Sequence, residues 1–439
     1  IIPRGCYDEL ISQLSSGGVR YEVVDKRQHG RKIDVRFNGE LYPEQQIAAA
    51  KMLSDDIGVL AAATAFGKTV LGAYMIAQKK VNALVLVHNV EIMNNWIKDL
   101  NAFLTINEEL PTYTTPKGRI KKRSSLIGTF SSQKDNTTGI VDIAMITSLG
   151  REDNINELVR NYGMVIVDEC HHVSSVSFEQ VLRKVKAKYV YGLTATPIRK
   201  DGHQPIIFMQ CGKIRFTADA QSQMNNQSFS RILIPRFTTF RNISSDDKTY
   251  TRVVETISKD EVRNRLIIDD VHKAIVEGRT PIVLTSLTSH VRVLADMLLP
   301  YSDNVITLVG ADSAKEKRRA MERLQNIPLT ESLVIVATGK YIGEGFDYPR
   351  LDTLFLVLPI SWKGNIAQYA GRLHRDCNGK SETRIYDYVD IRVPLCDSMY
   401  RKRLKGYASV GYGTIFTSYK TEISKHELIF DGNTYKSVF

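Results

Sequence analysis

The stretch around Gly67, Lys68 and Thr69 (residues 61–70) combines residue types that can hold the phosphates of a nucleotide. It follows an apolar run and precedes a helical pattern, LGAYMIAQK, which indicates a loop that opens into a helix. Backbone N–H groups of such a loop attract anions, because the positive end of the helix dipole lies behind them. Lys68 can then reach the terminal phosphates, and the Thr69 hydroxyl can hold Mg²⁺. The match is partial, since Ala62 stands where the full pattern has its first glycine, and an ordinary helix start is the alternative.

Two adjacent carboxylates end a second apolar run, GMVIVDECHH (residues 163–172). Asp168 is suited to hold Mg²⁺ through water, and Glu169 to orient and deprotonate an attacking water. A plain strand end with solvated acids is the alternative. The neighbouring His171 and His172 have no further ligands at zinc-like spacing, so a coupling role for His171 outweighs a metal role.

Hydroxyl groups end two further strand-like runs. YGLTATP (residues 191–197) carries Thr194 and Thr196, which can link the Glu169 region to whatever binds across the sheet edge. Thr147 and Ser148 can contact phosphates, as can the helix start after Asn89, although a capped helix or a turn explains either stretch equally well.

The second half of the chain contains a glycine-rich stretch after an apolar strand, ATGKYIGEGFDYP (residues 337–349). Gly343 and Gly345 permit close approach of the backbone to a ligand. Asp347 can accept a hydrogen bond from a ribose hydroxyl or position an arginine.

Further along, QYAGRLHR (residues 368–375) spaces Gln368, Arg372 and Arg375 by four and then three residues. This spacing predicts that all three lie on one face of one helix. Arginines there can reach a γ-phosphate and stabilise charge in the transition state, whereas a solvated basic helix is the alternative.

Gln45 or Gln46, in LYPEQQIAA before a predicted helix, can read the edge of an adenine with its amide. As a generic helix start this stretch would be unremarkable.

Apolar strand candidates alternate with helical patterns along most of the chain, which predicts an α/β fold with parallel sheets and helices on both faces. The carboxyl ends of such strands share one edge, so the polar residues above should lie close together. We expect a lead-in segment at 1–39, an ATP-binding lobe at 40–213, a connector with a hairpin or short helix at 214–260, a second lobe at 261–413 and a strand-rich tail at 414–439.

The composition is that of an ordinary globular protein, with 24% charged and 43% apolar residues among 439. A net charge of +11 favours a polyanionic partner. No run approaches the length of a membrane span, and five scattered cysteines argue against a zinc site or a disulfide framework and fit a reducing cytosol. The first residues, IIPRGCYDEL, resemble neither a signal peptide nor an initiator-methionine start, which suggests a fragment.

In order and type, these motifs resemble the superfamily 2 helicase and translocase core, from about Leu41 to Tyr407. The XPB-type and restriction-enzyme-type branch, which moves on DNA, is the most similar. The Arg-Glu-Asp element of that branch reads Arg199-Lys200-Asp201 here, which puts its unwinding role in doubt. The connector and SWKGNIAQYAGRLHR are also similar to helicases of bacterial TOTE conflict systems, in which the motor accompanies a primase or nuclease.

The resemblance implies two tandem RecA-like domains that bind ATP and Mg²⁺. It assigns Gln45 to the adenine-reading motif, Ala65-Phe66-Gly67-Lys68-Thr69 to motif I, Asp168-Glu169-Cys170-His171 to motif II, Thr194-Ala195-Thr196 to motif III, Gly343, Gly345 and Asp347 to motif V, and Gln368, Gly371, Arg372 and Arg375 to motif VI.

On these grounds we expect an ATP-dependent DNA helicase or translocase. We also expect it to be monomeric and cytoplasmic, in a bacterium or phage. An RNA helicase would share every motif, and a nucleotide-gated scaffold is the non-motor alternative. Candidate nucleic-acid contacts are Thr147, Ser148, Thr338 and Lys340. The basic run KGRIKKR (residues 117–123) can touch a duplex, although such runs are more often solvated faces. Trp362 can stack on a base or pack internally.

Overall fold

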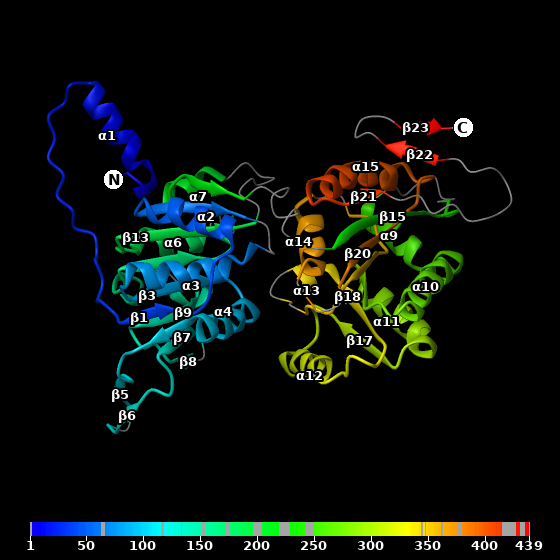
Figure 1. Ribbon diagram of the computed structural model, residues 1–439, viewed down its shortest axis with the longest axis horizontal. Helices are drawn as coiled ribbons and strands as arrows, with labels where there is room; N and C mark the ends of the chain where they lie inside the picture. The colour runs from blue at the N-terminus through cyan, green and yellow to red at the C-terminus, as the bar shows by residue number, and fades with distance from the viewer. Residues whose placement is uncertain are drawn as a thin grey trace. The chain divides into compact units, whose positions relative to one another are not determined.

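The computed structural model divides the chain into two compact units, Ile1–Asp219 (lobe 1) and Ala220–Phe439 (lobe 2), which are described separately here (Figure 1). The structure describes every residue except 1, 63–65, 116–117, 133, 152–153, 156, 172–175, 196–203, 219–228, 242–248, 344–345, 347, 361–362, 376, 378–379, 415–426, 431–434 and 439.

Lobe 1 is built on an eight-stranded sheet in the order β14-β2-β13-β12-β3-β9-β7-β8, parallel except for the antiparallel edge strand β8. Its strands are β2 (Ile57–Ala61), β3 (Ala83–Val87), β7 (Ile127–Ser131), β8 (Lys134–Asp135), β9 (Val141–Met145), β12 (Met164–Val167), β13 (Tyr189–Thr194) and β14 (Ile214–Thr217).

Helices cover both faces of this sheet, as alternation along the strands requires. In β12, Met164 and Ile166 join the hydrophobic cluster under one set of helices, whereas Val165 and Val167 join the cluster on the opposite face. The first set comprises α2 (Pro43–Leu53), α3 (Lys68–Lys79) and α4 (Val90–Phe103). The second comprises α5 (Ile146–Leu149), α6 (Val176–Lys184) and α7 (Gln204–Cys211).

The first residues of the chain also belong to lobe 1. A short 3₁₀ turn (Arg4–Cys6) and α1 (Tyr7–Ser16) precede β1 (Val35–Phe37), which pairs with β4 (Leu104–Ile106). Arg4 donates to the carbonyls of Leu182 and Val185, each at 2.7 Å, and so satisfies acceptors at the end of α6. The residues expected as a lead-in segment are therefore tied to lobe 1.

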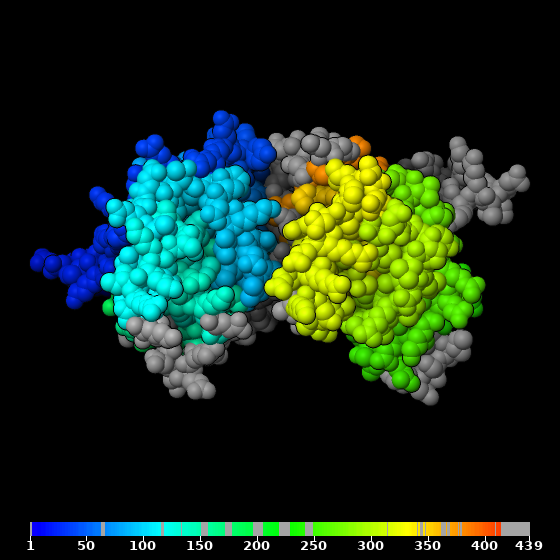
Figure 2. Space-filling model, turned by 90° about the horizontal axis from the view of Figure 1, so that it is seen from below, coloured from blue at the N-terminus to red at the C-terminus, as the bar shows by residue number. Residues whose placement is uncertain are grey.

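A two-stranded antiparallel ribbon, β5 (Thr112–Thr114) with β6 (Ile120–Lys122), extends from the sheet of lobe 1 (Figure 1). Figure 2 shows the cyan atoms of this part of the chain at the molecular surface. Smaller elements of the lobe are β10 (Gly150–Arg151), β11 (Asn154–Ile155) and a 3₁₀ turn (Glu157–Arg160).

Lobe 2 contains a seven-stranded, fully parallel sheet in the order β17-β18-β16-β19-β20-β15-β21. Its strands are β15 (Ser230–Phe237), β16 (Pro281–Thr285), β17 (Asn304–Leu308), β18 (Leu333–Thr338), β19 (Thr353–Leu356), β20 (Glu382–Val389) and β21 (Gly413–Thr414). Its helices are α9 (Tyr250–Ser258), α10 (Glu261–Val276), α11 (Thr288–Leu298), α12 (Ala314–Gln325), α13 (Gly339–Gly343), α14 (Lys363–Leu373) and α15 (Pro394–Ser409), with a 3₁₀ turn at Leu299–Tyr301.

The predicted fold class, parallel α/β sheets with helices on both faces, is confirmed. Residues 214–260, expected as a connector, are divided between the two units, because β14 pairs with β2 in lobe 1 and β15 pairs with β20 in lobe 2. In the tail, β22 (Glu427–Phe430) pairs with β23 (Tyr435–Val438). None of the described helices is long and apolar enough to cross a membrane.

Candidate nucleotide-binding site

The phosphate loop of lobe 1 ends at Gly67, whose backbone is left-handed (φ 79°, ψ 42°) and caps the start of α3. A side chain at this position would be strained, and its Cβ would lie 2.7 Å from Nε2 of Gln45. The first N–H groups of the twelve-residue α3 have no partners within the helix and carry the positive end of its dipole. This geometry suits a phosphate group.

Gln45 joins the phosphate loop to the start of α2. Its amide Nε2 donates to the carbonyl of Phe66 at 2.7 Å, while its Oε1 accepts from the backbone N–H of Tyr42 at 3.0 Å. The side chain is 5% exposed. Its neighbour Gln46 is exposed and donates to the carbonyl of Leu41. Gln45, expected at an adenine edge, therefore also fixes the position of the loop.

The ammonium group of Lys68 is buried beside this loop. Its Nζ donates to the carbonyl of Ala62 at 3.1 Å and lies 3.7 Å from Oε1 of Glu169. Lys68 and Glu169, 101 residues apart in the chain, thus meet at the carboxyl edge of the sheet, as the strand ends predicted. Thr69 follows in the first turn of α3 and is half-buried.

Asp168 lies just past β12 and is only 8% exposed. Its Oδ2 accepts from the indole Nε1 of Trp96 on α4 at 2.8 Å, and its Oδ1 accepts from the backbone N–H of Glu169 at 2.9 Å. Burial raises the pKa of this carboxyl, and the charge of Glu169 raises it further, whereas Lys68 and the two donors lower it. The pKa of Asp168 is raised overall, and the donors offset part of that rise in favour of the ionised form that a metal ion requires.

Glu169 and Thr194 are linked through one imidazole. His171 Nδ1 lies 3.2 Å from Oε2 of Glu169 and 3.0 Å from the hydroxyl of Thr194, which ends β13 and is fully buried. Glu169 itself has a left-handed backbone (φ 45°), which is uncommon outside glycine and often marks a functional position. The chain Lys68–Glu169–His171–Thr194 connects the phosphate loop to the neighbouring strand end.

The expected nucleic-acid contacts of lobe 1 lie on a separate strand end. Thr147 and Ser148 belong to the short α5, directly after β9, with Thr147 exposed and Ser148 half-buried. Ala65, Thr196 and the Arg199-Lys200-Asp201 element lie outside the described residues.

In lobe 2, Arg372 and Arg375 differ in their setting. Arg372 lies on α14, is 8% exposed and donates through Nε to the carbonyl of Ile342 at 3.3 Å. Arg375 was expected on the same helix, but α14 ends at Leu373, so Arg375 lies beyond it.

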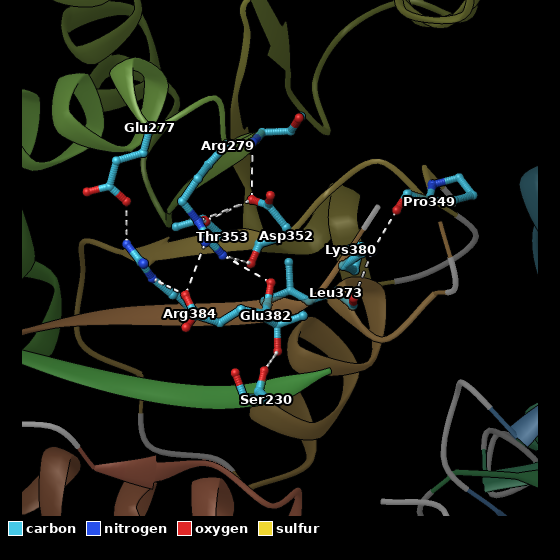
Figure 3. A network of polar contacts seen from close by, with 12 residues as sticks. Ser230, Glu277, Arg279, Pro349, Asp352, Thr353, Leu373, Lys380, Glu382 and Arg384 are labelled. Carbon is cyan, nitrogen blue, oxygen red and sulfur yellow. Dashed lines mark hydrogen bonds and ion pairs between the residues drawn. The ribbon is translucent and has the colours of Figure 1, made fainter. Parts of the chain in front are cut away.

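Lys380 stabilises the C-terminal end of α14. Its Nζ donates to the carbonyls of Leu373 at 3.0 Å and Pro349 at 2.7 Å (Figure 3). It also donates to the carbonyl of Arg375 at 2.7 Å. One ammonium group thereby holds the backbone on both sides of His374 against the loop before β19. Ammonium donors stabilise the unpaired carbonyls at a helix end.

The glycine-rich stretch of lobe 2 begins at the end of β18. Thr338 is 7% exposed, and its hydroxyl accepts from the N–H of Gly310 at 3.3 Å. Thr338 and Gly339 line a cavity of about 220 Å³ together with Tyr369 of α14. Gly343 ends α13. Gly345, Asp347 and Trp362 lie outside the described residues, as do the side chains of Lys340 and Gln368.

Two residues were missed by sequence reasoning. No motif of the sequence includes Trp96, and its contact with Asp168, 72 positions away, leaves no local pattern. Lys380 has no motif at all. Its three contacts are to backbone carbonyls, which no residue type reveals.

Comparison with known proteins identifies a family domain in lobe 1. Residues 38–199 match the family described as "Type III restriction enzyme, res subunit" (ResIII). Together with the helicase relatives described below, this match supports a superfamily 2 helicase core. This match covers the phosphate loop, Asp168, Glu169 and Thr194. The chain is accordingly an ATP-hydrolysing enzyme of the helicase class.

Relatives extend the helicase match over lobe 2. Transcript termination protein A18 of Fowlpox virus is 23% identical over 341 residues, 75% of this chain and 69% of that protein. Putative helicase 161L of Invertebrate iridescent virus 6 is 24% identical over 401 residues, 88% of this chain and 85% of that protein. In fold, the core resembles the ATP-dependent Type ISP restriction-modification enzyme LlaBIII bound to DNA, with a TM-score of 0.55 and 15% identity over 88% of this chain. This chain spans only 32% of that enzyme.

Proposed function

We propose that this helicase core couples ATP hydrolysis to translocation along DNA and to separation of its strands. The observation that carries the proposal is the buried chain Lys68–Glu169–His171–Thr194, which joins a phosphate-binding loop to a second strand end. A simple nucleotide-binding protein needs the loop, but it does not need a general base tied to a neighbouring strand.

The residues around the loop fit Mg²⁺ and ATP, because the start of α3 offers N–H groups without partners inside the helix beside the ammonium of Lys68, and Asp168, oriented by two donors, offers oxygen ligands of the kind that Mg²⁺ prefers. Mg²⁺·ATP, when bound, supplies the scissile phosphate bond and the charge that the site neutralises. Lys68 would exchange the carbonyl of Ala62 for phosphate oxygens, Thr69 would hold the metal ion, and Asp168 would hold it through water. Glu169 orients a water molecule and accepts its proton.

Lobe 2 supplies Arg372 and Arg375 in this proposal. Arginines stabilise the charge that develops during phosphoryl transfer, and they complete the site only when both lobes close on the nucleotide. Gln368, Thr196, His171 and Thr194 would couple lobe closure to the binding of nucleic acid. Gln45 and Asp347 contact the nucleoside, beside Ala65, Phe66 and Gly345 of the two loops.

DNA is proposed as the track because the motif order resembles the DNA-translocating branch. Thr147, Ser148, Thr338 and Lys340 would grip phosphates without reading bases, so sequence preference should be slight. An RNA track is the alternative, favoured by the relative named for transcript termination. A primase or nuclease partner remains a proposal that rests on the TOTE-like resemblance.

The test is steady-state ATP hydrolysis without nucleic acid and with single-stranded DNA, duplex DNA or RNA. Lys68→Ala, Glu169→Gln and Arg375→Ala should each abolish turnover in folded protein, whereas Glu109→Gln, at an exposed site, should not. Stimulation by RNA alone would replace the DNA proposal with the RNA alternative. Nucleotide-dependent DNA binding without turnover would indicate a scaffold.

A further inference from the structure

The β5–β6 ribbon of lobe 1 is a two-stranded arm with a strongly basic surface. Its three residue pairs are Thr112 with Lys122, Tyr113 with Lys121 and Thr114 with Ile120. Thr115 closes the tip by donating to the carbonyl of Arg119 at 2.8 Å, and its hydroxyl accepts from the Arg119 N–H at 3.1 Å. These bonds hold the two described strands of the ribbon together as a hairpin.

One arginine fastens this ribbon to the sheet. The Arg123 guanidinium lies over the ring of Tyr113, 4.3 Å from its centroid, and donates to the carbonyl of Asp135 in β8 at 3.0 Å. Its backbone N–H also donates to the carbonyl of Pro111 at 2.8 Å. Cation–π contact and hydrogen bonds together give Arg123 a structural role.

The other cations of the ribbon are not used in this way. Arg119, Lys121 and Lys122 are exposed, and within the described part of the chain their side chains form no hydrogen bond or ion pair. Ile120, between them, is 75% exposed. These three charges and the exposed side chain of Ile120 form no contacts that would stabilise lobe 1. Binding to a partner accounts for them better than folding does.

The ribbon lies far from the phosphate loop. Arg123 contacts β8, the last strand of the sheet, whereas the loop follows β2, six positions away in the strand order. At a strand spacing of about 4.8 Å, this separation is about 29 Å. Substitutions on the ribbon should therefore leave hydrolysis without nucleic acid unchanged.

We propose that the β5–β6 ribbon is a second nucleic-acid contact that binds duplex DNA through Arg119, Lys121 and Lys122. The major groove of B-form DNA admits a two-stranded ribbon, whereas the major groove of duplex RNA is too narrow and deep. The inference rests on nucleic acid being the partner of this enzyme. It adds a contact on a surface that carries none of the motif residues.

The experiment measures binding of fluorescein-labelled duplex DNA by anisotropy, without nucleotide, over a range of salt concentrations. The variant Arg119→Ala/Lys121→Ala/Lys122→Ala should bind at least tenfold more weakly. Its plot of log K against log salt should be shallower by about 2.7, at about 0.9 for each lost phosphate contact. Binding of single-stranded DNA should fall less. Hydrolysis without nucleic acid and the circular-dichroism spectrum should match the wild type.

The matched control removes the same charge elsewhere in lobe 1, by Lys51→Ala/Lys184→Ala/Lys186→Ala at exposed positions. An equal loss in this control, or an unchanged salt slope in the ribbon variant, would overturn the inference. So would an equal loss of single-stranded and duplex DNA. Wild-type protein that binds no nucleic acid at all would instead refute the proposed function and would point to an acidic protein as the partner of the ribbon.

Discussion

The indole N–H of Trp96 donates to Oδ2 of Asp168 across 2.8 Å, and both side chains are buried. The bond joins α4, which begins after β3, to the carboxylate expected to hold the metal ion at the end of β12. Trp96 is therefore a positioning residue, because it fixes the orientation of a carboxylate that would hold the metal ion through water.

Replacing Trp96 with phenylalanine keeps an aromatic ring and removes the donor. A hydrogen bond to a charged group contributes about 1.5–3 kcal/mol, so we expect turnover to fall about tenfold or more and the Mg²⁺ requirement to rise. Titrating Mg²⁺ against hydrolysis checks this. Leu100→Val, also in the buried face of α4, should lower stability without changing the Mg²⁺ requirement.

A second readout of the same bond is fluorescence. The chain has two tryptophans, so in a Trp362→Phe background the emission reports Trp96 alone. Adding Mg²⁺·ADP should change that emission. An unchanged spectrum, together with an unaltered Mg²⁺ requirement in Trp96→Phe, would rule out the positioning role.

Gly72 gives a test of how Trp96 is held in place. A Cβ at this position of α3 would lie 2.6 Å from the Trp96 ring, so Gly72→Ala should destabilise lobe 1 by about 1–3 kcal/mol. In a Trp96→Phe background the smaller ring should relieve the contact. A double-mutant cycle from denaturant unfolding measures this coupling, and additive effects would contradict it.

Lys380 should matter for turnover although it belongs to no motif. Lys380→Met removes the three bonds that hold the segment carrying Arg375, so we expect the maximal hydrolysis rate to fall several-fold. Nucleotide affinity should change little, because lobe 1 holds the phosphate loop. Lys402→Met, on the exposed face of α15, is the control. Equal rates for the two variants would show that Lys380 does not position Arg375.

Acid should destabilise lobe 2 through His290, which is 1% exposed. Burial, with a smaller effect of Arg263, lowers the pKa of this imidazole from 6.5 to about 3. Below pH 6.5 the unfolded chain therefore binds a proton that the folded protein does not, so stability falls as the pH falls towards 3. The loss should reach about 2 kcal/mol at pH 5.

Urea unfolding at pH 7.5 and pH 5 measures this effect. His290→Gln should reduce the difference between the two pH values, whereas His29→Gln, at an exposed position, should leave it unchanged. Identical pH dependence in the wild type and His290→Gln would contradict the prediction.

The strands and the site edge could be predicted from sequence because their signals are local. Apolar runs that end in Gly, Thr or Asp mark strand ends, and parallel pairing brings those ends together. This is why Lys68 and Glu169 were expected near each other. Neither the bond of Trp96 to Asp168 nor the three bonds of Lys380 to backbone carbonyls could be predicted. They depend on which groups face each other after packing. The end of α14 before Arg375 depends on the same backbone contacts.

The strand order of lobe 2 has a consequence for how the chain folds during synthesis. β15 is the first strand of that sheet to leave the ribosome, yet its two neighbours, β20 and β21, are the last. Some 150 residues must therefore be made before β15 can pair, and until then its edges are exposed to other chains. The sheet of lobe 1 is complete once β14 has been synthesised. We expect lobe 1 to fold first, and lobe 2 to be the part of a growing chain that depends on chaperones.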